Sequence, residues 1–288
     1  MKNKNWFEVS REGLKQLQAG KSKSFIVREL IQNAWDEDIS TCYLATSHSK
    51  GVTNITIEDD SPEGFRDITH AFTFFAPTYK RKDPEKRGRF NVGEKQVFAM
   101  CEKATVSTTK GTIIFSSEGR AHSHLKRKEG SIISLELKMN EEEYRKMLDS
   151  IGLYLPPKGI DFRVNNNPVP YKEPHKEFEV TLLTDIQKEN KMVRAYRKTK
   201  VRLHKADNDS SAYLYEMGLP ICKIDCPYHV DIQQRVPLSI DRNSRARCSR
   251  PIELSLVLNE THENVSSEES SESWIREATS NKWVSKEA

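Results

Sequence analysis

The sequence predicts an α/β protein with two units, and three observations lead to this fold class. Stretches that alternate apolar and polar residues, as half-buried strands do, recur between residues 52 and 138 among stretches of helical periodicity. The pattern changes after "LPPKG" at residues 155–159, where a second series of short strands begins. At 288 residues, the chain is also long enough for two hydrophobic cores.

The composition is that of a globular protein with a polar surface. Hydrophobic residues make up 36% of the chain and charged residues 31%. No apolar run approaches the roughly 18 residues that a membrane-spanning helix needs. The opening stretch "MKNKNWFEVSREGLKQ" lacks the apolar core of a signal peptide, so we expect a cytoplasmic protein with no membrane partner.

The first unit is expected at residues 1–155. Its predicted elements are a short amphipathic helix (6–20), a second helix (around 28–38), a strand (52–60), an irregular cover (66–89), a helix from residue 90, three strands ("ATVSTT", "TIIFSS" and "SIISLELK") and a helix capped by Asn140 (140–152). The cover has an apolar half with Phe72, Phe74 and Phe75, which could pack when it closes. Its charged half, from Lys80 to Arg89, is expected to stay solvated.

The second unit is expected at residues 156–257. "IDFRVNNNPVPY" predicts a strand and a turn, and "AYLYEMGLPICKID" predicts two strands joined at Met217 and Gly218. Residues 258–288 begin with an acidic, serine-rich stretch, which predicts a flexible linker before the start of a further helical segment.

The stretch "RELIQNAWDED" (28–38) places polar groups on one face of the second helix. At about 100° per residue, Glu29, Asn33 and Asp36 lie close together. The apolar residues of the helix centre on the opposite side: Val27, Leu30, Ile31 and Ala34. Two carboxylates and a carboxamide on one face suit a hard cation such as Mg²⁺ and an activated water. A solvated polar stripe on a surface helix is the alternative.

Three later stretches complete a set of motifs with this helix. "IEDDSPEGF" places Asp59 at a strand end and Gly64 five residues on, "GRFNVGEKQVF" is a glycine-rich turn that opens a helix, and "EGSIISLEL" begins a strand after Gly130. In order and rough spacing, the four stretches resemble the ATP-binding domain of the GHKL superfamily, which comprises the gyrase B subunit, heat-shock chaperones, sensor histidine kinases and MutL. The resemblance covers about residues 25–137. It implies a two-layer Bergerat-type sandwich, with helices over a mixed, largely antiparallel sheet, followed by a smaller α/β transducer-like domain.

The resemblance implies a role for each matching residue. Glu29 matches the general base that polarises the attacking water, and Asn33 matches the Mg²⁺ ligand. Asp59 matches the carboxylate that accepts a hydrogen bond from the adenine amino group, and Ser131 matches the hydroxyl that supports this contact. The other implied ATP-binding positions are Asp36 near the base and sugar, Gly64 beside the base, and Gly88, Asn91, Val92, Gly93 and Lys95 at the phosphates. For Lys95, an ordinary helix-surface lysine is the alternative.

Two positions depart from the family pattern. Ser61 replaces the first glycine after Asp59, with one extra residue before Gly64, and Asn91 replaces the middle glycine of the phosphate turn. Asn is the non-glycine residue that best tolerates the left-handed backbone, so we expect the fold to tolerate this replacement. ATP binding is therefore better supported than efficient hydrolysis.

The resemblance fits the hydrolase branch of the superfamily better than the kinases, because Glu29 is present and no His precedes it. It implies Mg²⁺-dependent ATP binding and slow hydrolysis, closure of the cover and a nucleotide-dependent homodimer formed through the N-terminal segment. An ATP-gated binding module or a chaperone-like switch with little turnover is the alternative. MORC-, MutL- and phage rIIA-like proteins are the suggested relatives, and Gln234, Arg235 and Arg242 are candidate γ-phosphate sensors.

Other functional interpretations rest on weaker patterns. A P-loop would need a glycine directly before Lys95, where Glu94 stands. Cys222, Cys226 and His229, with Cys248, could hold zinc. The net charge of +4 is too small to indicate nucleic acid, but basic clusters at residues 79–89, 124–130 and 241–250 make DNA a possible partner; solvated loops are the alternative.

Overall fold

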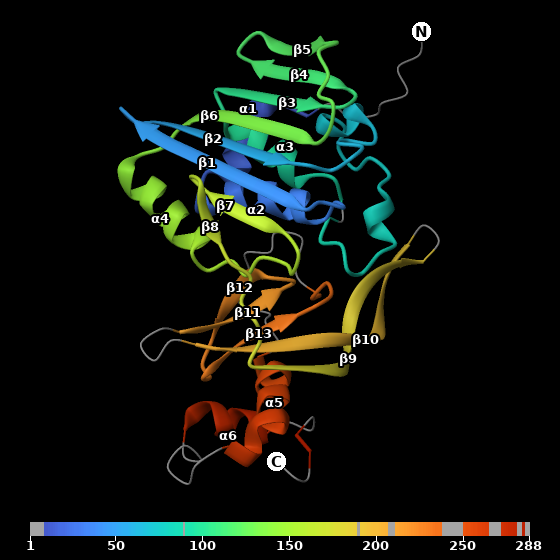
Figure 1. Ribbon diagram of the computed structural model, residues 1–288, viewed down its shortest axis with the longest axis vertical. Coiled ribbons are helices and arrows are strands. Elements are labelled where there is room, and N and C mark those ends of the chain that lie inside the picture. The colour runs from blue at the N-terminus through green and yellow to red at the C-terminus, as the bar shows by residue number, and fades with distance from the viewer. Residues whose placement is uncertain are drawn as a thin grey trace. The chain divides into compact units, whose positions relative to one another are not determined.

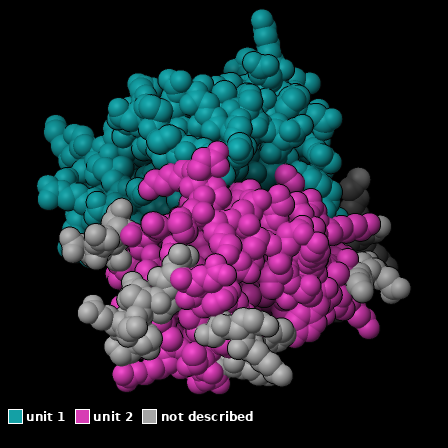
Figure 2. Space-filling model, turned by 60° about the horizontal axis from the view of Figure 1, so that its bottom comes forward, with its two compact units in different colours: residues 1–81, 88–171 teal, residues 82–87, 172–288 magenta. Residues whose placement is uncertain are grey.

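The computed structural model describes residues 9–88, 90–188, 191–206, 211–237, 250–264, 272–280 and 284–285. The chain forms two compact units, which Figure 2 distinguishes by colour. The first comprises residues 1–81 and 88–171, and the second comprises residues 82–87 and 172–288. Six residues of the predicted cover, 82–87, thus belong to the second unit.

The first unit contains an eight-stranded mixed sheet (Figure 1). In order across the sheet, its strands are β5 (Gly119–Ser123), β4 (Gly111–Ser116), β3 (Lys103–Thr108), β6 (Ser131–Lys138), β2 (Val52–Asp59), β1 (Thr41–Ser49), β7 (Asp161–Val164) and β8 (Asn167–Val169). All neighbouring strands are antiparallel except β1 and β7, which are parallel. The predicted mixed, largely antiparallel sheet is confirmed.

The described helices of this unit are α1 (Arg11–Gln18), α2 (Ser24–Trp35), α3 (Gly93–Met100) and α4 (Glu141–Ile151). Helices α1, α2 and α3 lie behind the sheet in Figure 1, and α2 contacts α3, α4, β1 and β2. The apolar face predicted for α2 is buried, since Val27 and Ile31 are 0% exposed and Leu30 is 1% exposed. Burial of this face leaves the polar face of α2 for the site described below.

The helix α4 begins as predicted. The Asn140 side chain accepts a hydrogen bond from the Glu143 N–H at 2.8 Å, and the Glu143 carboxylate accepts one from the Asn140 N–H at 3.0 Å. This reciprocal pair satisfies two backbone donors that the helix itself leaves unpaired.

The second unit contains a five-stranded sheet. In order, its strands are β12 (Leu219–Ile224), β11 (Ala212–Glu216), β13 (Tyr228–Ile232), β10 (Lys191–Lys205) and β9 (Lys176–Lys188). Only β11 and β13 are parallel among these described pairs. The predicted turn at Met217 and Gly218 joins β11 to β12, with φ of 50° and 86°.

Two helices complete the core of the second unit. Leu254 and Val257 of α5 (Arg250–Thr261) and Trp274 of α6 (Ser273–Thr279) are buried in one cluster with the sheet. Helix α5 includes the start of the stretch predicted to be a flexible linker, and residues 265–271 of that stretch lie outside the described residues. None of the described helices is long and apolar enough to cross a membrane.

Candidate functional site

The polar face of α2 lies against the start of α3. The Asn33 carboxamide donates from Nδ2 to Glu94 Oε2 at 3.3 Å. A Cβ atom added to Gly93 would lie 2.0 Å from Glu29 Oε2, so only glycine permits the carboxylate to come this close. The guanidinium of Arg28 lies 3.8 Å from the other Glu29 oxygen. The structure therefore brings together Glu29, Asn33 and the glycine-rich turn.

Asp36, at the end of α2, holds the first glycine of this turn. Its side chain is 0% exposed, and Oδ2 accepts a hydrogen bond from the Gly88 N–H at 2.7 Å. The Lys80 ammonium lies 3.9 Å from the same oxygen. In this structure, Asp36 thus sets the position of the turn, whereas the resemblance implies a place near the base and sugar.

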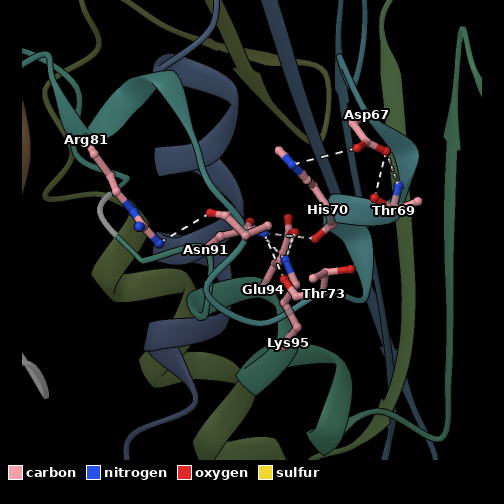
Figure 3. Close-up of polar contacts among 9 residues, drawn as sticks. Asp67, Thr69, His70, Thr73, Arg81, Asn91, Glu94 and Lys95 are labelled. Carbon is pink, nitrogen blue, oxygen red and sulfur yellow. Dashed lines mark hydrogen bonds and ion pairs between the residues drawn. The ribbon is translucent and has the colours of Figure 1, made fainter. Parts of the chain in front are cut away.

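Asn91 connects the turn to the cover. Its φ of 53° lies in the left-handed region, which Asn tolerates better than other non-glycine residues. Its Nδ2 donates to the carbonyls of His70 (3.3 Å) and Thr73 (3.0 Å), and its Oδ1 accepts from Lys95 Nζ at 2.9 Å (Figure 3). His70 lies in η1 (Ile68–Ala71), a short 3₁₀ helix of the cover. A single side chain therefore joins the cover, the turn and Lys95.

Lys95 is buried, so the interpretation as a surface lysine is wrong. Its ammonium lies 2.6 Å from Glu94 Oε1, and both residues are 5% exposed. Burial lowers the pKa of Lys95, and the Glu94 carboxylate opposes that shift. The Val92 carbonyl accepts the N–H groups of Lys95 and Gln96, so α3 starts here. The free N–H groups of a first helical turn favour anions, and the Lys95 charge lies beside them.

Asp59, Gly64 and Ser131 also come together, at the ends of β2 and β6. Asp59 pairs with Ser131 in the sheet register. Gly130 has a φ of 68°, and a Cβ there would lie 1.9 Å from the Asp59 carbonyl oxygen. Gly64 has a φ of 56°, and a Cβ there would lie 2.9 Å from the Gly130 carbonyl oxygen. Two glycines thus allow the loop after β2 to pack on the start of β6.

The Asp59 carboxylate is a desolvated acceptor. Burial raises its pKa to about 6; a hydrogen bond from the Ser61 N–H opposes this rise, and the nearby Glu37 charge adds to it. The Ser61 N–H donates to Asp59 Oδ1 at 3.0 Å. The substitution of Ser for the family glycine therefore leaves the loop folded around Asp59. A carboxylate in such a place strongly favours a ligand that donates a hydrogen bond.

Glu37, Tyr79 and Lys80 form a second contact, between the cover and the segment that follows α2, that sequence reasoning missed. Tyr79 and Lys80 lie in η2 (Tyr79–Arg81) of the cover. The Tyr79 hydroxyl donates to Glu37 at 2.8 Å, and the Lys80 ammonium lies 2.7 Å from Glu37. The predicted solvation of Lys80 is wrong, because its side chain is 12% exposed. Opposite charges in "WDED" and "YKRK" were the available signal.

The second unit holds residues 82–87 through Arg235. This residue is 0% exposed; its N–H donates to the Pro84 carbonyl at 2.9 Å and its Nε to the Lys86 carbonyl at 2.5 Å. Arg87 is 3% exposed and donates to the Met217 carbonyl, so its predicted solvation is also wrong. Of the predicted γ-phosphate sensors, Arg235 binds this backbone segment, Gln234 donates to the Leu182 carbonyl at 3.3 Å, and Arg242 lies outside the described residues.

The possible zinc site is not supported. In the described part of the chain, no three His, Cys, Asp or Glu side chains are grouped to hold a metal ion. His229 Nδ1 accepts a hydrogen bond from the Tyr213 N–H at 3.0 Å, and Cys226 donates to the Tyr228 carbonyl. Cys248 lies outside the described residues.

Residues 21–151 match a family model described as histidine kinase-, DNA gyrase B-, and HSP90-like ATPase. The matched segment starts just before α2 and ends with α4, so it contains both groups of predicted residues. Among curated proteins, none matches the chain significantly.

Proposed function

Because residues 21–151 belong to the GHKL superfamily of ATP-binding domains, we propose that this chain binds ATP with Mg²⁺, hydrolyses it slowly, and responds by closing the cover and dimerising. The observation that carries the proposal is the contact between α2 and the turn at Gly88–Gly93. It places the Glu29 carboxylate and the Asn33 carboxamide beside a helix N-terminus and a buried lysine. The N–H groups of the helix N-terminus and the lysine ammonium can bind the phosphates of ATP, and the Glu29 carboxylate can activate the hydrolytic water.

The side chains present fit Mg²⁺. Asn33 Oδ1 accepts no hydrogen bond within the described part of the chain, which leaves this oxygen for a cation. Mg²⁺ in nucleotide sites takes few protein oxygens, together with phosphates and waters. When bound, the ion supplies positive charge against the phosphates. Glu29 then orients the water and takes its proton, and Asp59 accepts a hydrogen bond from the adenine amino group.

ATP binding is tested with the Asp59→Asn variant. We expect saturable binding to the wild type and a fall in affinity of about 10- to 100-fold in the variant, because a hydrogen bond to a charged group is worth about 1.5–3 kcal/mol. The preference for ATP over GTP should fall as well. Calorimetric titration measures both, with Asp38→Asn, an exposed carboxylate, as the matched control. Wild-type protein that does not bind ATP saturably would refute the proposed function.

The pH dependence of the ATP affinity, measured by the same calorimetric titration, tests whether the Asp59 carboxylate is the adenine acceptor. Burial raises the pKa of Asp59 to about 6, so this carboxyl is ionised at pH 7 and becomes protonated below pH 6. Protonation weakens it as an acceptor, so the wild-type affinity for ATP should fall as the pH drops from 7 to 5. In the Asp59→Asn variant, protonation of ATP itself still changes the affinity, but the loss of affinity from protonation of Asp59 is absent. An identical pH profile in the two proteins would exclude Asp59 as the adenine acceptor.

Dimerisation is proposed through α1. In α1, Leu17 is 74% exposed, and Val9, shortly before the start of this helix, is 59% exposed. Trp6 and Phe7, also predicted to form the apolar surface, lie outside the described residues. In the cover, Phe75 is 63% exposed with a φ of 56°, a backbone conformation that is strained for an aromatic residue. Closure that buries such side chains would offset that strain. A nucleotide shifts this equilibrium only if it binds the closed state better.

We expect a monomer with ADP and a dimer with a non-hydrolysable ATP analogue. Leu17→Glu should prevent the dimer, because it would place a charge in the apolar contact, whereas the exposed neighbour Gln16→Glu should not. Sedimentation velocity measures the mass. The same mass with both nucleotides, or a dimer of Leu17→Glu, would contradict this mechanism.

The basic clusters support a DNA partner only in part. In residues 79–88, Lys80 pairs with Glu37 and Arg87 is buried, so these charges are not free for phosphates. Most of the cluster at 241–250 lies outside the described residues. In the loop 124–130, Lys126 and Lys128 are exposed. We therefore place the proposed DNA contact at this loop; such a contact would weaken steeply with added salt.

A further inference from the structure

Glu94, the residue after Gly93, contacts both Asn33 and Lys95. Its Oε2 accepts from Asn33 Nδ2 at 3.3 Å, and its Oε1 accepts from Lys95 Nζ at 2.6 Å. Figure 3 shows Glu94, Lys95 and Asn91 side by side. The side chains of Glu94 and Lys95 are 6% and 4% exposed, so water screens their contact little. We propose that Glu94 is a positioning residue, which orients the Asn33 carboxamide so that its oxygen meets Mg²⁺.

The orientation of Asn33 follows from its hydrogen bond, and the inference rests on the proposed function. A carboxamide has one oxygen that can bind a cation and one NH₂ group that cannot. Because Nδ2 donates to Glu94, Oδ1 points to the other side. Without an acceptor at position 94, the terminal torsion of Asn33 has two broad, nearly equivalent orientations, and one of them turns NH₂ toward the ion. Groups that orient metal ligands typically contribute about 10- to 100-fold to metal affinity.

The contact with Lys95 predicts an asymmetry between metal-bound and metal-free ATP. Lys95 also donates to Asn91 Oδ1 at 2.9 Å, so its ammonium group keeps a partner when Glu94 is removed. Removing Glu94 also takes a negative charge away from the proposed phosphate site. The affinity for metal-free ATP should therefore stay the same or rise, while the affinity for Mg²⁺·ATP falls.

The test is calorimetric titration of ATP in excess Mg²⁺ and, separately, in EDTA. We expect the factor by which Mg²⁺ raises the affinity for ATP to fall at least about tenfold in Glu94→Ala. Glu94→Gln keeps an oxygen that can accept from Asn33, so it should retain more of this factor than the alanine variant. Glu136→Gln, which changes an exposed carboxylate of β6, is the control and should match the wild type.

A pair of double variants covers the case in which Glu94→Ala does not fold, because that change leaves the Lys95 charge buried with no counter-charge from Glu94. Glu94→Gln with Lys95→Met, and Glu94→Leu with Lys95→Met, both remove the two charges. Only the first keeps an acceptor for Asn33, so we expect a larger Mg²⁺ factor for the first.

The outcomes separate this inference from the proposed function. Equal losses of affinity with Mg²⁺ and with EDTA would mean that Glu94 only supports the local fold, and the inference would be wrong. An unchanged Mg²⁺ factor in Glu94→Ala, or equal factors in the two double variants, would also overturn it. Failure of the wild type to bind ATP at all would instead refute the proposed function.

Discussion

Replacing Glu29 by Gln should leave ATP bound and slow its hydrolysis by about 10²- to 10⁴-fold, the usual contribution of a general base. The two side chains have the same shape, so the close approach to Gly93 is kept and the turn stays in place. The carboxamide cannot take a proton from water. Single-turnover hydrolysis with excess protein measures the chemical step, and calorimetry on the same sample measures the affinity for ATP.

Glu136→Gln, which changes an exposed carboxylate of β6 outside the proposed site, is the control for this experiment and should hydrolyse ATP at the wild-type rate. If Glu29→Gln also hydrolyses at that rate, Glu29 has a structural role only. Wild-type protein that binds ATP but does not turn it over would favour the alternative of an ATP-gated binding module. Binding and turnover therefore separate the two functions proposed for the same fold.

The elements that could be predicted from the sequence are those whose causes are local. The buried face of α2 follows from the spacing of Val27, Leu30 and Ile31, and the start of α4 follows from Asn140 three residues before Glu143. That Asn can stand at position 91 in place of glycine follows from the tolerance of Asn for positive φ. In each case, the residues that determine the feature lie within about four positions of it in the sequence.

The contacts that were missed join residues far apart in the chain. Asn33 and Glu94 are 61 positions apart, and Tyr79 and Glu37 are 42 apart. Only the tertiary fold brings such residues together, so the buried state of Lys80 had no local signal beyond opposite charges. The assignment of residues 82–87 to the second unit likewise depends on Arg235, which lies about 150 positions further on.

The long hairpin of β9 and β10 was missed although the sequence carries a signal for it. In the second half of β10, the basic residues Lys198, Lys200 and Arg202 alternate with uncharged residues. They pair with acidic residues across the hairpin: Lys198 lies 2.5 Å from Glu179, and Arg202 lies 2.7 Å from Glu177. Because so many residues of this strand are charged, the apolar residues of the opposite face, such as the fully buried Val201 and Leu203, are easily overlooked in the sequence. Period-two alternation of charge can therefore indicate a strand as clearly as alternation of apolar residues.

Gly130→Ala should abolish measurable ATP binding and destabilise the first unit by about 2–5 kcal/mol. The φ of 68° is unfavourable for alanine, and the new Cβ would lie 1.9 Å from the Asp59 carbonyl oxygen. Because that oxygen belongs to the backbone of β2, the collision is relieved only if the strand end moves. Such a shift would displace the Asp59 carboxylate from Ser131, its partner in the sheet register.

Gly51→Ala provides the matched control for Gly130→Ala, since its φ is 76° and no atom lies within 4 Å of the added Cβ. It carries the cost of the left-handed backbone alone, about 1–2 kcal/mol, and should bind ATP normally. Urea unfolding and calorimetric titration of both variants measure the two effects. Equal destabilisation and equal ATP affinity in the two variants would show that the approach of Gly130 to Asp59 does not shape the site. A larger loss of ATP affinity in Gly130→Ala would instead show that the proposed adenine contact depends on the close approach of Gly130 to the end of β2.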